Sequence, residues 1–280
     1  MDENLKNEKT YDRVFWTTIE KLKRFIIPLI NEAFDDNIPE DAEIKLKPTK
    51  IVVRQPDGSL KETEVDSMIE VIGKDGSQLG LYHFECQDWG GKGVAIKIAE
   101  YGVGKAYSSI RETENGVVVT LPNSAVILLR GNTVSSDEYT ITLEYPNGSA
   151  SYNVPIVKVD EYDLDAILSK NLWLLLPYYG FRFVGLFEAI EKRKGDITEE
   201  ERKEINNSVI RVNELLEGSI RDGRLSIDEG AEIAELFDRV LQKLTIKIDK
   251  KGELGIMKTE IIRTKTDELL ERGMKKGMVQ

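Results

Sequence analysis

The stretch DSMIEVIGKDGSQLGLYHFECQDWGGKGVAIKIAE, residues 66–100, decides the fold and holds the groups that could carry chemistry. An apolar run at 66–73 ends at Lys74-Asp75-Gly76, and a second run follows at 80–89. Asp-Gly turns between short apolar runs are typical of antiparallel strands. After two glycines the spacing becomes helical over about 94–111. The stretch therefore predicts two paired strands followed by a helix.

Polar side chains lie at regular intervals along the second of these strands. Alternation places His83, Glu85 and Gln87 on one face and Cys86, with its aromatic neighbours, on the other. A hairpin of this length can bring Asp66 beside Glu85. Two carboxylates and a backbone carbonyl suit Mg²⁺, which can bridge a phosphate oxygen and lower the pKa of an attacking water. A merely solvated strand face is the alternative, but polar groups in an apolar strand need partners.

The N-terminal region predicts a helix and a further strand. Apolar residues recur at three- and four-residue spacing over 11–36, and Pro28 should kink this helix or divide it in two. A connector follows at 37–49. The run IVVRQ at 51–55 predicts the first strand of an antiparallel meander that continues into 66–73.

The region after residue 111 predicts more strands and then helices. The continuous apolar run 125–131 predicts a strand that is covered on both faces. The runs 138–146 and 151–159 are joined by a Pro-Asn-Gly turn and predict a hairpin. Residues 161–245 are mostly helical, and Thr198 with Glu201 predicts a capping box at one helix start.

These elements predict an α/β protein in which a mixed central sheet is flanked by helices, in the order αβββαβ, with a C-terminal helical extension. We expect a core at 1–160, a helical region at 161–245 and a charged tail at 246–280. Two apolar stripes in the helical region, at 209–216 and 233–244, favour intramolecular packing, although a homodimer is the alternative.

Composition excludes several kinds of site. The chain has 280 residues, a net charge of −11, one cysteine and one histidine. A disulfide framework, a cysteine-cluster zinc site and a multi-histidine metal centre are therefore excluded. An acidic chain is a poor candidate for binding nucleic acid through a basic surface, but an enzyme that grips DNA locally and uses cations is compatible with it.

No stretch of the sequence predicts a membrane segment. The longest uncharged apolar stretch, 171–181, has 11 residues and contains Pro177, whereas a membrane span needs about 20 residues. The polar, acidic N-terminus lacks the pattern of a signal peptide. We therefore expect a cytoplasmic protein with no membrane association.

Seven segments together resemble a known family. They are YDRVFWTTIE (11–20), IIPLINEAF (26–34), VDSMIEVIG (65–73), YHFECQ (82–87), IKIAEYG (96–102), NSAVILLRG (123–131) and LWLLLPYYGFRF (172–183). In order and content they resemble the PD-(D/E)XK nuclease superfamily, and within it the Rpn branch of recombination-promoting nucleases and transposase-like proteins. YHFECQ after an Asp-led strand is the most specific of these segments.

The resemblance implies roles for four residues. Asp66 and Glu85 match the metal-binding acids, and Gln87 stands where many relatives carry a catalytic lysine. A neutral amide can orient water but adds no positive charge. Lys97 lies where the family's helix usually carries arginine, so it could substitute for that lysine or contact a phosphate. A surface ion pair with Glu100, which lies three residues further on, is the competing interpretation.

Further residues are accessory candidates. Glu32 could supply another acid, although a solvated helix face is the alternative, and Asp12 matches a family aspartate that could cap the first helix. His83 could contact substrate or be a satisfied structural residue. Trp89 and Lys92, in the loop after the strand, could touch DNA or belong to a plain turn.

The sequence thus predicts an endonuclease that uses Mg²⁺, with Mn²⁺ as a substitute, to hydrolyse phosphodiester bonds in DNA during recombination or mobile-element activity. RNA as the substrate is chemically equivalent. The alternative is an inactive nuclease-like core that binds nucleic acid or protein, which Gln87 in place of lysine and the acidic composition favour.

Overall fold

The computed structural model describes residues 3–54, 59–106, 109–193, 197–246 and 248. The chain divides into two compact units, residues 1–161 and 162–280, and each is treated separately below. Every strand among the described residues belongs to the first unit, and the described elements of the second unit are helical. Among the described residues, no helix combines the length and apolarity that a membrane crossing requires.

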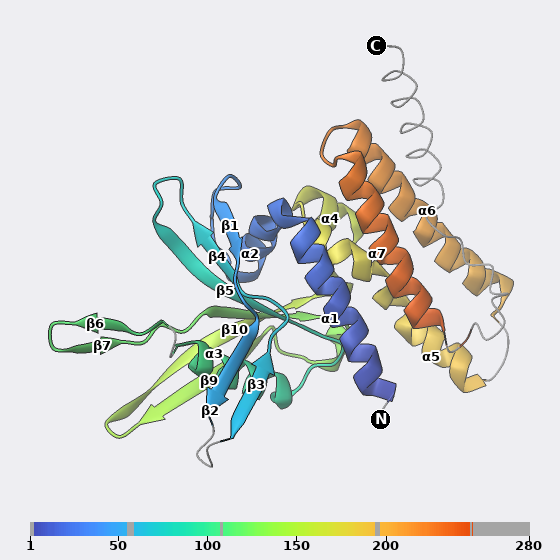
Figure 1. Ribbon diagram of the computed structural model, residues 1–280. Coiled ribbons are helices and arrows are strands. Elements are labelled where there is room, and N and C mark those ends of the chain that lie inside the picture. The colour runs from blue at the N-terminus through green and yellow to red at the C-terminus, as the bar shows by residue number, and fades with distance from the viewer. Residues whose placement is uncertain (1–2, 55–58, 107–108, 194–196, 247, 249–280) are drawn as a thin grey trace, which may run out of the picture. The chain divides into compact units, whose positions relative to one another are not determined.

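The first unit is built on a mixed six-stranded sheet with the order β1-β4-β5-β8-β10-β9 (Figure 1). The strands are β1 (Glu43–Leu46), β4 (Ile69–Ile72), β5 (Gln78–Gln87), β8 (Asn123–Leu128), β9 (Glu138–Tyr145) and β10 (Gly148–Lys158). β5, β8 and β10 run parallel to one another, and the remaining neighbours are antiparallel. β8 is buried along almost its whole length, as its continuous apolar sequence predicts.

Helices cover both faces of this sheet. Phe34, at the end of α2 (Ile26–Phe34), contacts the rings of Tyr82 and Phe84 on one face of β5. On the other face, Val94 and Ile98 of α3 (Lys92–Ala106) join a core cluster with β8, β9 and β10. α3 also supplies the crossover that the parallel pair β5 and β8 needs.

The predicted division of the N-terminal helix is confirmed. α1 (Glu3–Lys21) ends before a 3₁₀ turn, η1 (Lys23–Phe25), and α2 begins at Ile26. Pro28 lies in the first turn of α2, where its missing N–H would have no partner inside the helix. The break therefore precedes the proline.

The predicted meander is wrong in its first strand. β2 (Lys50–Arg54) does not precede β4 in the main sheet but pairs with β3 (Leu60–Glu64) in a separate two-stranded sheet. β1, inside the expected connector, takes the place beside β4. The sequences EIKL of β1 and LKETE of β3 are too polar to suggest strands. β1 depends on a remote partner, whereas β3 forms a local hairpin with β2.

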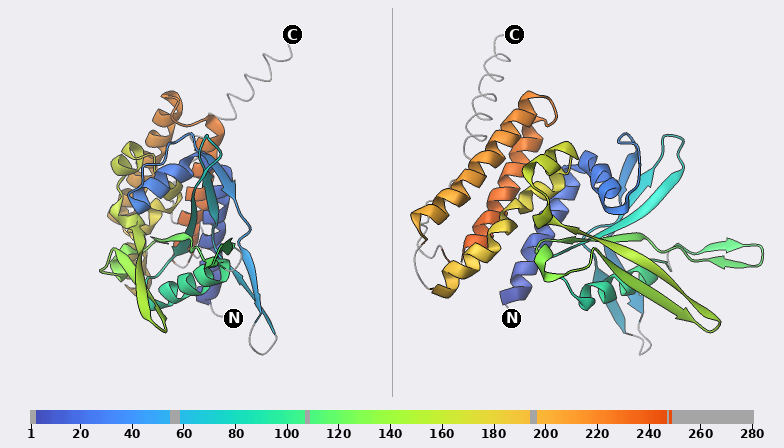
Figure 2. Two further views of the ribbon diagram at one scale, coloured as in Figure 1. Left: turned by 90° about the vertical axis from the view of Figure 1, so that its left-hand side faces the viewer. Right: turned by 180° about the vertical axis from the view of Figure 1, so that it is seen from behind.

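The hairpins show how much local turn chemistry determines. The β4–β5 hairpin turns at Lys74-Asp75-Gly76, where Gly76 has a φ of 80° and Asp75 accepts the Ser77 N–H. The β9–β10 hairpin turns at 146–147, also as predicted. A third hairpin, β6 (Arg111–Thr113) with β7 (Gly116–Val118), lies where the sequence analysis named no strand. All three project from the same end of the sheet (Figures 1 and 2).

The second unit is helical, as predicted. Its elements are α4 (Leu164–Ser169), η5 (Trp173–Phe183), α5 (Val184–Arg193), α6 (Glu199–Arg221) and α7 (Ile227–Thr245). Two 3₁₀ turns, η3 (Gly131–Thr133) and η4 (Val159–Glu161), belong to the first unit. The Thr198–Glu201 capping box is present at the start of α6, and Ser226 with Glu229 repeats it at α7. Most of the two apolar stripes is buried within the chain, which favours intramolecular packing.

Candidate functional site

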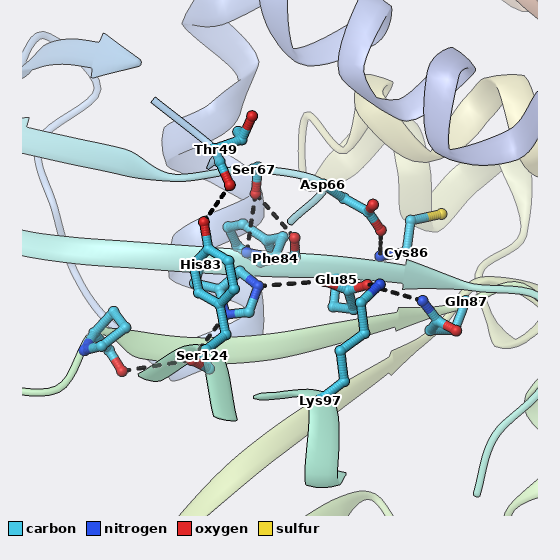
Figure 3. A network of polar contacts seen from close by, with 12 residues as sticks. Thr49, Asp66, Ser67, His83, Phe84, Glu85, Cys86, Gln87, Lys97 and Ser124 are labelled. Carbon is cyan, nitrogen blue, oxygen red and sulfur yellow. Dashed lines mark hydrogen bonds and ion pairs between the residues drawn. The ribbon is translucent and has the colours of Figure 1, made fainter. Parts of the chain in front are cut away.

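Glu85 is the centre of a buried polar network on β5 (Figure 3). Its side chain is fully buried and accepts hydrogen bonds from three side chains. Gln87 Nε2 donates to Oε1 at 3.0 Å, Lys97 Nζ from α3 forms a very short ion pair with the same oxygen, and His83 Nε2 lies 3.4 Å from Oε2. The expected common face of His83, Glu85 and Gln87 is therefore confirmed, and it faces α3.

His83 positions Glu85 and is itself held on all sides. Its Nδ1 lies 3.1 Å from Ser124 Oγ, and its ring stacks on Tyr101 with centroids 5.3 Å apart. If Nε2–H donates to the Glu85 carboxylate, Nδ1 of a neutral His83 accepts a hydrogen bond from the Ser124 hydroxyl. Because the ring is fully buried, the structure supports the structural interpretation of His83 and not direct contact with a substrate.

Asp66 lies three residues before β4 begins, outside the sheet, and its side chain contacts the backbone of β5. The ladder between β4 and β5 ends at Ile69 and Tyr82. Beyond it, Ser67 Oγ both accepts the Phe84 N–H at 2.9 Å and donates to the Phe84 carbonyl at 3.0 Å. The Asp66 carboxylate then accepts the Cys86 N–H at 2.8 Å. Side chains thus replace the missing strand and fix Asp66 next to Glu85.

Charge is unevenly distributed among these groups. Burial and the negative charges of Glu85 and Asp12 raise the pKa of Asp66 well above its ordinary value, although Lys97 opposes this. Burial also raises the pKa of Glu85, but the hydrogen bonds from His83 and Lys97 and the charge of Lys97 outweigh it, so the net shift is downward. Burial lowers the pKa of Lys97, but the negative charges of Glu85 and Asp66 outweigh it, so the net shift is upward. One cation faces three carboxylates.

Lys97 forms an ion pair with Glu85 in this network. Its ammonium reaches back from α3 to Glu85 on β5, whereas Glu100 is exposed on the same helix. Gln87 also contacts Glu85, so its amide orients the carboxylate. The positive charge beside Glu85 comes from Lys97 on α3.

Glu32 and Asp12 are not among the residues that Figure 3 labels. Glu32 is half-buried on α2. Asp12 lies in the middle of α1, so the expected capping role is wrong, because the helix begins nine residues earlier at Glu3. Its negative charge acts on Asp66 and Lys97 instead. Cys86 is buried on the opposite side of β5 from Glu85, as predicted.

The carboxyl ends of β5 and β8 carry a second group of polar residues. The two strands are in register, with Gln87 beside Leu128, and Leu129 N–H donates to the Gln87 carbonyl at 2.9 Å. Asp88 and Arg130 follow these strands and form an ion pair with an N–O distance of 2.6 Å. Binding sites in α/β sheets commonly lie outside the carboxyl ends of parallel strands. Sequence reasoning missed both residues, because the parallel register that joins them cannot be read from spacing.

The donor set can be tested for a metal ion. Among the described residues, no group of three or more His, Cys, Asp and Glu side chains is arranged to hold one. Asp66 and Glu85 are two carboxylates of one network, and Mg²⁺ is commonly held by one or two carboxylates while it keeps several waters. The negative charges of Glu85 and Asp12 act on Asp66, and a divalent cation would stabilise them. In number and kind these carboxylates suit Mg²⁺, although both oxygens of Glu85 already accept hydrogen bonds.

Comparison with known proteins finds no family model, no curated protein and no solved structure that matches the chain.

Proposed function

We propose that the protein is a metal-dependent nuclease of the PD-(D/E)XK type, akin to the Rpn branch, that hydrolyses phosphodiester bonds in DNA. The observation that carries the proposal is the meeting of Asp66, Glu85 and Lys97 at one position of a mixed sheet. Carboxylates that could hold a metal ion, and a cation that could stabilise developing negative charge, suit metal-assisted phosphodiester hydrolysis.

Each residue has a distinct role in this proposal. Asp66 and Glu85 would hold Mg²⁺, which supplies positive charge at a phosphate oxygen and lowers the pKa of a bound water when it is present. His83 and Gln87 hold the Glu85 carboxylate in one orientation. In known metal sites, hydrogen bonds of this kind from neighbouring side chains fix the orientation of the metal ligands.

Lys97 takes the part of the lysine that Gln87 replaces. Its ammonium lies against Glu85 and in the field of Asp66, so it remains protonated across the neutral pH range. A fixed positive charge there would stabilise negative charge as it develops on the phosphate. With 39% of its side chain exposed, Lys97 is accessible to a ligand, whereas Glu85 is not exposed at all.

One observation favours the second candidate, an inactive core that only binds. Both oxygens of Glu85 already accept hydrogen bonds from protein side chains. A metal ion would have to share Glu85 with these donors or displace Lys97. In the inactive alternative, Lys97 would serve as a permanent counter-ion.

Cleavage assays with matched variants test the proposal. Supercoiled plasmid, circular single-stranded DNA and a labelled RNA oligonucleotide would be incubated with Mg²⁺, Mn²⁺ or EDTA. We expect metal-dependent cleavage that disappears in Asp66→Asn. Lys97→Met should reduce the rate about 10²- to 10³-fold, as loss of a fixed electrostatic donor does elsewhere, and Lys97→Arg should retain much of it.

The control is Asp75→Asn, which changes an exposed carboxylate in the β4–β5 turn and should leave cleavage unchanged. Cleavage of RNA alone would move the proposal from DNA to RNA. If folded protein cleaves none of the three substrates with either metal, the binding module becomes the better account. Cleavage that survives in Asp66→Asn would show that the site is elsewhere.

A further inference from the structure

Trp89 is an exposed aromatic residue in a rigid setting. It follows β5 by two residues and 54% of it is exposed. The guanidinium of Arg130 lies over its ring, 4.4 Å from the centroid. Asp88 holds that guanidinium with contacts of 2.6 Å to Nε and 3.4 Å to Nη2. Arg130 is therefore fixed against the indole, which makes the stack a preorganised cation–π pair.

The loop that carries Trp89 is also pinned on its far side. The Gly90 N–H donates to Thr133 Oγ1 at 3.1 Å, and the Gly91 N–H donates to the Tyr139 hydroxyl at 2.8 Å. A Cβ added at Gly90 would lie only 1.9 Å from Val134 Cγ2, so the loop fits tightly against the segment after β8. A plain turn needs none of these anchors. They hold an exposed indole in one place.

Trp89 and Arg130 lie at the same edge of the sheet as the candidate catalytic site, and we call this stacked pair the platform. Trp89 and Arg130 follow β5 and β8, whose carboxyl ends lie side by side. Gln87, the last residue of β5, contacts Glu85 directly. A polymer bound along this edge of the sheet can therefore contact Trp89 with one residue while another lies near Asp66 and Lys97.

The chemistry of the platform selects a flat, aromatic ligand. Bases of single-stranded nucleic acid stack on aromatic side chains, whereas bases in a duplex already stack on their neighbours. Charge supports the same conclusion. With a net charge of −11, the chain gains little from general attraction to phosphates, so a nucleic acid must be held by local contacts such as stacking.

We propose that Trp89, braced by Arg130 and Asp88, is a stacking platform for an unpaired nucleobase, and that single-stranded nucleic acid is the substrate class of the neighbouring site. The inference rests on the proposed nuclease function. It adds what that function leaves open, namely the strandedness of the substrate and a residue that binds it away from the scissile phosphate.

Binding measured in EDTA tests this inference separately from catalysis. The probes are fluorescein-labelled dT20, rU20 and a 20-base-pair DNA duplex, each titrated with the full chain and followed by fluorescence anisotropy. Stacking of one base is worth about 1–3 kcal/mol, so we expect Trp89→Ala to weaken binding of the single strands about 5- to 150-fold. Trp89→Phe should lose much less, because a phenyl ring also stacks.

Tyr145→Ala is the matched control. Tyr145 is an aromatic residue with the same exposed fraction, 54%, but it lies at the end of β9 in the β9–β10 hairpin. Its removal should not change binding. Circular dichroism and thermal unfolding establish that each variant is folded. Comparison of dT20 with rU20 shows which kind of single strand the platform prefers.

The outcomes separate the two proposals. Equal binding of single strand and duplex, or single-strand binding that survives in Trp89→Ala, would overturn the platform while metal-dependent cleavage, measured independently, could still stand. Cleavage by a wild-type protein that binds no single strand would also overturn it. Loss of single-strand binding in Trp89→Ala but not in Tyr145→Ala, without any cleavage, would support the platform and remove the nuclease.

Discussion

At the residue scale, the most informative group of the site is the Asp66 carboxylate, whose ionised form is destabilised in the folded protein. Burial, together with the negative charges of Glu85 and Asp12, disfavours the charged form of Asp66 in spite of the nearby cation Lys97. A site that binds a divalent cation has to tolerate this cost whenever the cation is absent. Asp66→Asn should therefore stabilise the metal-free protein, because an amide oxygen can still accept the Cys86 N–H.

We expect Asp66→Asn to raise the free energy of unfolding by roughly 0.5–2 kcal/mol at pH 8 in EDTA, the range of single stabilising substitutions. The pKa of Asp66 is higher in the folded state than in the unfolded state. The penalty in the wild type is therefore full above the folded pKa and vanishes as the pH falls toward the unfolded value near 3.8. Urea unfolding at a series of pH values measures the difference.

Asp75→Asn should show the opposite pH dependence. Hydrogen bonds from Ser77 lower the pKa of Asp75, so its contribution to stability is present above its unfolded value and is lost as the pH falls through the folded one. If Asp66→Asn destabilises the protein at pH 8, the carboxylate is better satisfied than the structure indicates.

Single residues also show how far sequence reasoning reaches into the site. Strand alternation was sufficient to place His83, Glu85 and Gln87 on one face, because β5 is regular over 82–87, where it pairs with β8 without a break. It could not place Arg130 beside Asp88, since that pair depends on the parallel register of two strands that are distant in the chain. The contact of Lys97 with Glu85 was not predicted, because it depends on how α3 packs against β5.

At the scale of elements, the loop between β5 and α3 is where packing most directly controls function. Gly90→Ala would force a methyl group against Val134 at 1.9 Å. Such overpacking costs about 1–3 kcal/mol. Chemical denaturation should show this loss, and nucleic-acid binding should weaken with it if Trp89 shifts.

Two further substitutions make the Gly90→Ala experiment specific. Val134→Ala removes the opposing methyl group, so the double variant should recover part of the loss, which a double-mutant cycle measures as coupling. Gly93→Ala, one turn of chain away in α3, meets no neighbour within 4 Å and should stabilise the helix by about 0.5–1 kcal/mol. Equal losses at both glycines would show that backbone freedom, and not Val134, is the cause.

The same scale explains which elements the sequence predicted. The β4–β5 and β9–β10 hairpins carry their own turn residues, and α6 begins with its own capping box, so local chemistry was enough. β1 is short and charged, and it depends on hydrogen bonds from β4, which lies much further along the chain. β3 is equally polar and pairs with β2, the strand just before it. The polar sequence of each gave no signal of a strand.

At the scale of the whole molecule, the chain consists of two compact units, and all the proposed chemistry belongs to the first. Within the first unit, α3 packs on the sheet that carries Glu85. Within the second, α7 packs with η5 and α6 (Figures 1 and 2). A ligand of the first unit should therefore stabilise that unit selectively.

Hydrogen exchange of the full chain, followed by mass spectrometry, measures this selectivity. A ligand that binds only the folded state at about 100 times its Kd adds about 2.7 kcal/mol of stability. Saturating Mg²⁺ should therefore slow exchange in β5 and α3 of the wild type, and this protection should be missing in Asp66→Asn. Exchange in α6 and α7 should not change, because the metal ligands are in the other unit.

A substitution in the second unit completes the argument. Thr198→Ala removes the N-cap of α6 and should cost about 1 kcal/mol there, which accelerates exchange in α6 without altering β5. If Mg²⁺ instead protects α6 and α7 as strongly as β5, the chain opens as one cooperative block. The division into two compact units would then not be a division of stability, and a site in the first unit would report on the folding of the entire chain.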